Sequence, residues 1–175
     1  IKGASLPDGK KVDISISNGV IASVGSVFKG EAQSVIDGKN CVVLPGLVDL
    51  HTHLREPGKE EAETIDSGSR AAALGGFTAV VAMPNTDPAQ DNVATVQFVR
   101  ERGLAVGLCE VIPSGCITVG RLGAKLVPFD QLANEGVTLF TDDGTGVQDA
   151  LVMQRALMAA KRLNLTISQH CEVAS

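Results

Sequence analysis

The feature that most constrains the fold of this chain is a regular alternation of apolar runs and helix-like segments that begins at Leu47. Five apolar runs, rich in β-branched and other aliphatic residues, lie at 46–51, 77–83, 104–111, 137–140 and 165–170. They lack the polar–apolar alternation of a half-exposed strand, and such runs are typical of a parallel sheet covered on both faces. The alternation of strand and helix therefore predicts an α/β fold, either a doubly wound sheet or a (β/α) barrel.

The segments between these runs carry the signals of helix ends. Helices are predicted within 64–76, 91–103 and 149–164. Asp91 or Asn92 is the expected N-cap of the second helix and Gly103 its stop, whereas Asp149 begins the third helix. An eight-stranded barrel takes about 250 residues, so we expect residues 45–175 to be the N-terminal part of one, truncated after about five βα units.

Residues 1–44 have a different pattern of polar and apolar residues from the rest of the chain. Polar and apolar residues alternate on both sides of the Ser-Asn-Gly turn signal at 17–19, which predicts a β-hairpin. A second short strand pair is predicted about the Asp-Gly-Lys sequence at 37–39. We therefore expect a small antiparallel β domain over 1–44, separate from the barrel part over 45–175.

Composition and charge argue against several classes of partner. The net charge is −5 at pH 7 and no stripe of Lys or Arg occurs, so we expect no nucleic-acid partner. No apolar run reaches the roughly 18 residues of a membrane span and no basic-then-apolar leader is present, so we expect a soluble protein with no membrane partner. The four cysteines are widely spaced without a C-x-x-C pair, which favours buried free thiols in a reducing compartment, the cytoplasm.

Two of the three histidines stand one residue apart at the end of the first apolar run. Because strand side chains alternate, His51 and His53 should project to one face with their Cα atoms about 7 Å apart, close enough to share a metal ion. His170 ends the fifth run in the same way, and Asp142 and Asp143 end the fourth. In a barrel these strand ends meet at the catalytic face.

Each of these residues also has an ordinary structural interpretation. The histidines would fit surface positions, or core positions bonded to backbone carbonyls, and "TDDG" at 141–144 would fit an acidic turn. Three strands that end in a nitrogen or oxygen ligand at the same height nevertheless favour a metal site. Imidazole and carboxylate donors without a cysteine cluster indicate zinc or a similar divalent ion in a hydrolytic centre.

Two further polar residues follow the first two strands. Arg55 offers a planar guanidinium fork suited to a substrate carboxylate, and Asn85 offers an amide in a loop between two prolines. Hydrogen bonds that only stabilise the loops are the alternative for both. The residues alone leave both interpretations open for Arg55 and Asn85.

Four segments together resemble the dihydroorotase family, in the class I form common in bacteria, within the amidohydrolase superfamily. They are "LPGLVDLHTHLREPG", "GGFTAVVAMPNTDPAQD", "FTDDG" and "ISQHCE". The H-x-H motif alone is shared across the superfamily, but its combination with R-x-P-G and M-P-N-T is much narrower. The resemblance extends over essentially all 175 residues.

The resemblance implies a two-zinc centre in a (β/α)8 TIM-type barrel, flanked by a small β-sandwich built from both chain termini. His51 and His53 would bind the first zinc ion, Asp143 and a hydroxide would bridge both ions, and His170 would bind the second. Many relatives bridge with a carbamylated lysine, but the segment before the fourth strand offers no lysine at a strand end. "TDDG" matches the branch in which an aspartate bridges.

The same resemblance implies how the substrate is held. His53, Arg55 and Asn85 would contact it and hold its carboxylate. A further metal-binding histidine and the general acid/base aspartate are expected beyond Ser175, so no residue of this chain is expected to move the proton to the leaving nitrogen.

The implied activity is the zinc-dependent interconversion of N-carbamoyl-L-aspartate and L-dihydroorotate in de novo pyrimidine biosynthesis. One alternative is a related cyclic amidase, dihydropyrimidinase or allantoinase, although these generally use a modified lysine and need no arginine for a carboxylate. The other is a non-catalytic dihydroorotase-like scaffold of aspartate transcarbamoylase, although such chains lose the H-x-H. The sequence leaves open a homo-oligomer and an association with aspartate transcarbamoylase.

Overall fold

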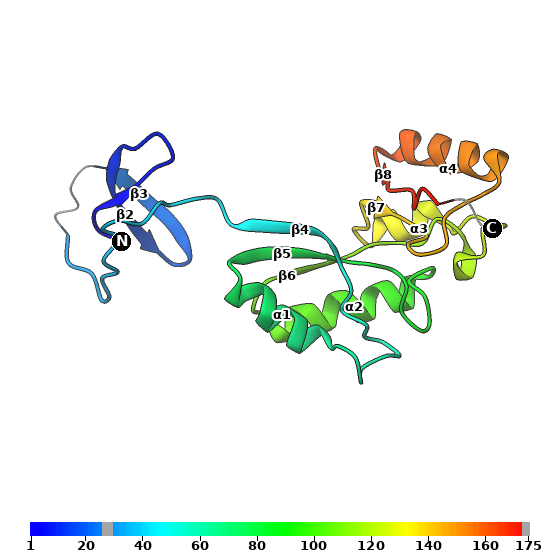
Figure 1. Cartoon of the computed structure of the whole chain (residues 1–175), viewed down its shortest axis with the longest axis horizontal. Helices are drawn as coiled ribbons and strands as arrows, with labels where there is room; N and C mark the ends of the chain where they lie inside the picture. The colour runs from blue at the N-terminus through cyan, green and yellow to red at the C-terminus, as the bar shows by residue number, and fades with distance from the viewer. Residues whose placement is uncertain (26–29, 173–175) are drawn as a thin grey trace. The chain divides into compact units, whose positions relative to one another are not determined.

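The computed structural model of the chain describes residues 1–25 and 30–172. Contacts between residues divide the chain into two compact units, Ile1–Pro45 and Gly46–Ser175, at a boundary one residue beyond the expected one. Figure 1 traces both units by residue number. Each unit has its own β-structure.

The first unit holds a three-stranded antiparallel sheet of β1 (Ala4–Ser5), β2 (Lys11–Ser17) and β3 (Val20–Gly25). β2 and β3 form a hairpin. Asn18 and Gly19 join them with φ angles of 52° and 75°, the left-handed conformation that a two-residue hairpin turn of this kind needs at both positions. The predicted hairpin is therefore confirmed.

The second strand pair, predicted about residues 37–39, is wrong. The chain does turn there, since Cys41 N donates to the Gly38 carbonyl at 3.0 Å, but the segment then runs parallel to β1. Ser5 N donates to the Cys41 carbonyl at 2.9 Å, and Val43 N donates to the Ser5 carbonyl at 2.8 Å. β1 pairs with β2 along its other edge, so its remaining edge takes this segment. The unit is thus not wholly antiparallel.

The second unit is an α/β fold with parallel strands, as predicted. β4 (Leu47–Thr52), β5 (Phe77–Ala82) and β6 (Glu110–Pro113) form one parallel sheet, and β7 (Leu139–Phe140) and β8 (Thr166–Ile167) form a parallel pair. A parallel bridge between Gly115 and Phe140 connects the two. Neighbouring strands therefore follow one another in chain order, without the reversal that defines a doubly wound sheet.

The α-helices of this unit are α1 (Ile65–Leu74), α2 (Val93–Val106), α3 (Phe129–Asn134) and α4 (Ala150–Leu163). α1 and α2 cover one face of the β4–β6 sheet, whereas α3 and α4 accompany β7 and β8 (Figure 1). The side chains of Thr64, Asn92 and Asp149 cap α1, α2 and α4, so Asn92 is the cap and Asp91 is not. The sequence did not predict α3, because six residues are too few to show a helical period.

The predicted stop of the second helix at Gly103 is wrong, and so is the first part of the strand predicted at 104–111. α2 continues through Val106 and ends at Gly107, whose φ of 64° is the left-handed C-cap conformation. Gly103 is buried inside the helix, where an added Cβ would stand 2.5 Å from the Cβ of Val111 on β6. The close approach of α2 to β6 therefore requires this glycine.

Buried apolar side chains form two clusters in the second unit, one around Phe140 and the other around Val80. β5 is largely buried, as expected for a covered parallel strand. β4 is different, since it exposes Leu47, Val48 and Leu50. Among the described residues β4 pairs only with β5, so the prediction of a strand covered on both faces fails for β4.

All four cysteines are free, as predicted, but they are not all buried. Only Cys116 is buried, and this burial raises the pKa of its thiol. Cys109 is half-buried, and Cys41 and Cys171 are exposed. Within the described ranges, no helix has the length and apolar character needed to cross a membrane.

Candidate metal centre

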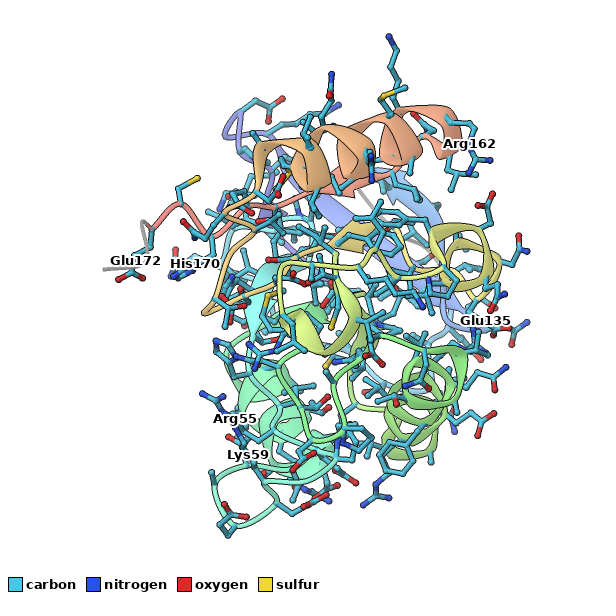
Figure 2. All side chains as sticks on the ribbon, turned by 90° about the vertical axis from the view of Figure 1, so that its right-hand side faces the viewer. Arg55, Lys59, Glu135, Arg162, His170 and Glu172 are labelled. Atoms are coloured by element: carbon cyan, nitrogen blue, oxygen red, sulfur yellow. The ribbon has the colours of Figure 1, made fainter. Side chains whose placement is uncertain are left out.

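The predicted site residues lie at the carboxyl ends of the parallel strands. His51 is the penultimate residue of β4 and His53 comes directly after the strand. Asn85 follows β5, Asp143 follows β7 and His170 follows β8. Figure 2 shows Arg55 and His170 at one edge of the view and Glu135 at the opposite edge. Because parallel strands end on one side of a sheet, the candidate side chains share that side.

Asp143 lies between the two neighbouring histidines. Its Oδ1 is 3.4 Å from His51 Nε2, and its Oδ2 is 3.5 Å from His53 Nε2. The candidate ligand atoms of the three residues lie within 4.8 Å of one another, and Asp143 is 7% exposed. The structure thus brings together three of the four residues that were predicted to bind metal.

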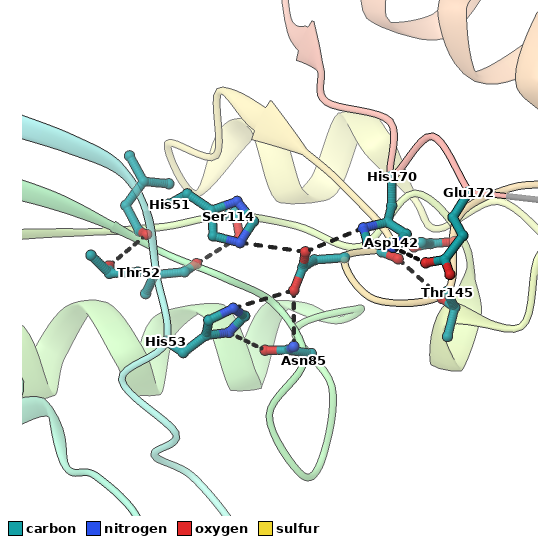
Figure 3. A network of polar contacts seen from close by, with 12 residues as sticks. His51, Thr52, His53, Asn85, Ser114, Asp142, Thr145, His170 and Glu172 are labelled. Atoms are coloured by element: carbon teal, nitrogen blue, oxygen red, sulfur yellow. Dashed lines mark hydrogen bonds and ion pairs between the residues drawn. The ribbon is translucent and has the colours of Figure 1, made fainter.

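Asn85 connects His53 to Asp143. Its Oδ1 lies 3.0 Å from His53 Nδ1, and its Nδ2 donates to Asp143 Oδ2 at 3.0 Å (Figure 3). A carboxylate only accepts, which fixes the orientation of the amide, and the amide oxygen in turn requires a proton on His53 Nδ1. Asn85 therefore favours the form of His53 that carries a proton on Nδ1 and has its Nε2 towards Asp143. Metal-binding histidines often donate a hydrogen bond from their other ring nitrogen in this way.

The donors of this cluster suit a divalent cation. Because the Nδ1 proton of His53 is directed to Asn85, its Nε2 faces the Asp143 carboxylate, and a cation or a proton between Nε2 and the carboxylate oxygen would stabilise this contact. Two imidazoles and one carboxylate are a donor set that zinc takes in hydrolytic sites. His51, His53 and Asp143 therefore form a candidate metal centre.

His170 lies at the margin of this cluster. Its Nδ1 is 3.9 Å from Asp143 Oδ1, and its Nε2 is 2.9 Å from Glu172 Oε2 (Figure 3). It is not among the three residues whose ligand atoms converge within 4.8 Å. Sequence reasoning missed Glu172, although its place two residues after a strand-end histidine was a signal that could have found it.

Asp142 takes no part in the cluster. It is fully buried, and its Oδ1 accepts hydrogen bonds from Ile117 N at 2.8 Å and Thr118 N at 3.1 Å. Its Oδ2 accepts from the Thr118 hydroxyl. Asp142 therefore fastens the loop after β7 to the loop after β6, while its neighbour Asp143 faces the histidines. The sequence gave no sign of this role for Thr118, because it depends on how two loops meet.

Arg55 is held by its neighbours in an unusual backbone conformation, with a φ of 61°. The next residue, Glu56, is buried and accepts from Ile65 N at 2.8 Å and from Arg102 Nε at 3.1 Å, which ties the loop to α1 and α2. In the part of the chain that the structure describes, no hydrogen bond or ion pair involves the Arg55 guanidinium. Arg55 thus has a fixed backbone and a side chain available to a ligand.

The fold of the chain is similar to that of hydantoinases. The chain superimposes on a crystal structure of D-hydantoinase with a TM-score of 0.73 at 22% identity, over 95% of this chain and 38% of the other. An L-hydantoinase (dihydropyrimidinase) from Arthrobacter aurescens gives a TM-score of 0.70 at 18% identity, over 95% and 39%. Identity this low shows a shared fold alone.

The sequence comparisons are more specific. The sequence model of the dihydro-orotase-like family matches residues 40–175, and the chain belongs to this family. Proteins named dihydroorotase from Mycobacterium tuberculosis and Streptomyces coelicolor are 48% and 45% identical to it, over 94% and 98% of this chain and 39% and 41% of theirs. That of Aquifex aeolicus is 44% identical, over 91% and 38%. The chain spans about two fifths of the length of these relatives.

Proposed function

We propose that the protein containing this chain is a dihydroorotase, a metal-dependent cyclic amide hydrolase that interconverts N-carbamoyl-L-aspartate and L-dihydroorotate in de novo pyrimidine biosynthesis. The observation that carries the proposal is the convergence of His51, His53 and Asp143 at the ends of β4 and β7. The identity of 44–48% to three dihydroorotases supports the choice of substrate.

The fold of the whole protein is proposed to be a barrel with a small β-sandwich beside it in the sequence. The strands of the second unit neighbour one another in chain order, which supports a (β/α)8 barrel that these strands begin. The antiparallel hairpin and the parallel segment along β1 support a small β-sandwich to which residues 1–44 contribute.

The proposed metal ions are two zinc ions. His51 and His53 would hold the first, Asp143 would contribute to both, and His170 would hold the second. The position of Asp143 supports a ligand shared by both ions, because its Oδ1 faces His51 and His170 and its Oδ2 faces His53. When bound, zinc supplies a Lewis acid and lowers the pKa of a coordinated water to about 7.

The protein's own residues orient the metal ligands and the substrate. Asn85 keeps the His53 proton on Nδ1 and holds one oxygen of Asp143, which leaves its second N–H for the substrate. Arg55 would form a bidentate pair with the carboxylate that distinguishes dihydroorotate from an unsubstituted dihydropyrimidine. The rigid tie of Glu56 to α1 and α2 would keep that guanidinium in place.

Substrate choice tests the proposal against its alternatives. The zinc-loaded protein should open dihydroorotate and leave dihydrouracil intact, whereas a dihydropyrimidinase would do the reverse. A scaffold would act on neither, even with zinc bound. Light scattering with and without aspartate transcarbamoylase tests the homo-oligomer and the association that the resemblance leaves open.

Arg55→Lys tests whether the Arg55 guanidinium binds the carboxylate of the substrate. Lysine keeps the charge but loses the fork, and a hydrogen bond to a charged group contributes about 1.5–3 kcal/mol, so KM for dihydroorotate should rise roughly ten- to hundredfold with zinc content unchanged. Arg155→Lys, on the exposed side of α4, is the matched control. An unaltered KM in Arg55→Lys would remove Arg55 from the substrate site.

A further inference from the structure

Asp143 lies in a loop, and neither a helix nor a strand fixes its backbone. This Asp143 loop, residues 141–146, packs against the β6–α3 loop, residues 114–128. On one side of Asp143, the buried Asp142 carboxylate is anchored to the backbone of Ile117 and Thr118. A second contact on the C-terminal side of Asp142 is needed to keep the Asp143 side chain in one orientation.

Arg121 provides the second anchor. Its Nη1 donates to the Asp143 carbonyl oxygen at 2.6 Å. The hydroxyl of Thr145 lies 3.1 Å from the Arg121 carbonyl oxygen and 3.0 Å from that of Asp142, and Figure 3 shows Thr145 beside Asp142. The side chain and the backbone of Arg121 therefore both contact the Asp143 loop.

Two features of Arg121 are unfavourable for the stability of the folded protein. Its φ is 58°, a left-handed conformation that residues other than glycine seldom adopt. Its Nε is buried without a hydrogen-bond partner among the described residues, which leaves a donor of a charged group unsatisfied. Backbone strain of this kind persists where the surrounding contacts enforce it, and it gathers at functional sites.

We propose that Arg121 is a positioning residue for Asp143. Because the Asp142 side chain and the Asp143 carbonyl are both held, the backbone around Asp143 is restrained, and this restraint keeps its carboxylate between His51 and His53. Arg121 acts through Asp143 and does not itself coordinate the metal. This inference rests on the metal centre of the proposed function.

The test compares Arg121→Met with the matched control Arg155→Met, which removes an exposed arginine of α4. Zinc affinity is measured by competition with a chromogenic chelator. Loss of an outer partner of a metal ligand lowers metal affinity about 10–100-fold, and we expect this loss in Arg121→Met and none in Arg155→Met. Arg121→Lys, which can still donate to the Asp143 carbonyl, should recover part of the affinity.

Hydrogen exchange of the metal-free protein gives a second measurement that needs no zinc. Thr145 N and Gly146 N donate to the Asp142 carbonyl at 3.0 and 2.9 Å, and their exchange should quicken in Arg121→Met while the rest of the second unit is unchanged. Wild-type zinc affinity in Arg121→Met overturns the proposal, and so does faster exchange spread over the whole unit. If the wild-type protein itself binds no zinc, the metal centre of the proposed function fails, and the exchange measurement still tests the hold of Arg121 on the loop.

Discussion

Asp142 and Asp143 are adjacent carboxylates whose surroundings differ because successive residues after β7 point to different sides. Asp142 is fully buried against Ile117 and Thr118, and Asp143 faces the histidines. The residues alone favoured neither aspartate as the ligand, and only the family resemblance selected Asp143. The geometry gives the two residues separate and measurable consequences.

Asp143→Ala should lose zinc and keep its fold, whereas Asp142→Ala should lose stability. The second substitution leaves two backbone N–H groups and the Thr118 hydroxyl buried without an acceptor, and each such group costs about 1–3 kcal/mol. Metal analysis and urea unfolding of both variants check this pair of outcomes. A stable Asp142→Ala protein that binds no zinc would show that the two roles are exchanged.

At the scale of elements, local signals predicted the helix starts, the hairpin and the parallel order, because capping residues, turn residues and apolar runs act within a few positions. They failed at Gly103, since a glycine usually marks a helix end and only the packing of Val111 against it requires one inside α2. In the site, strand ends predicted that His51, His53 and an aspartate after β7 would meet, whereas His170 lies at the margin. The contacts of Asn85 and Arg121 were not predictable, because they depend on loop conformations such as the left-handed φ of Arg121.

Gly103→Ala should destabilise the second unit although alanine favours helix. Its Cβ would stand 2.5 Å from the Cβ of Val111, and neither atom can turn away without a shift of α2 or β6. Overpacking of this kind costs about 1–3 kcal/mol. The gain in helix propensity from glycine to alanine is at most about 1 kcal/mol, so the cost outweighs it. Chemical denaturation measures the net effect, with Glu101→Ala on the exposed side of α2 as the control. A more stable Gly103→Ala would show that α2 can move away from β6.

The ion pair between α3 and α4 should show in the titration of Asp130. Arg162 donates to both carboxylate oxygens at 2.8 Å and lowers the Asp130 pKa below its ordinary value. The pair therefore contributes stability above the ordinary carboxyl pKa and loses it as the pH falls through the lowered one. NMR titration should find the Asp130 pKa raised in Arg162→Gln and unchanged in Arg155→Gln. An equal Asp130 pKa in all three proteins would mean that this exposed pair does not persist in solution.

At the scale of the whole second unit, one bridge among the described residues, between Gly115 and Phe140, joins the sheet β4–β6 to the pair β7–β8. The candidate ligands come from both parts, since His51 lies in β4 and His53 directly after it, whereas Asp143 lies beyond β7. A bound ion would therefore connect two sub-sheets that backbone hydrogen bonds connect only weakly. Metal binding and folding of this unit are expected to be coupled for that reason.

Removal of zinc should accordingly lower the melting temperature of the second unit. Zinc present at about 100 times its dissociation constant stabilises the folded state by about 2.7 kcal/mol, which corresponds to roughly 5–10 °C for a unit of this size. Calorimetry with and without a chelator measures the shift, and Asp143→Ala should melt at the same temperature in both. The β2–β3 hairpin of the first unit holds none of the ligands, so its amide exchange should not respond to the chelator. An equal melting temperature of the wild-type protein with and without the chelator would mean that packing already holds the two sub-sheets together. The ion would then serve catalysis and add nothing to the stability of the unit.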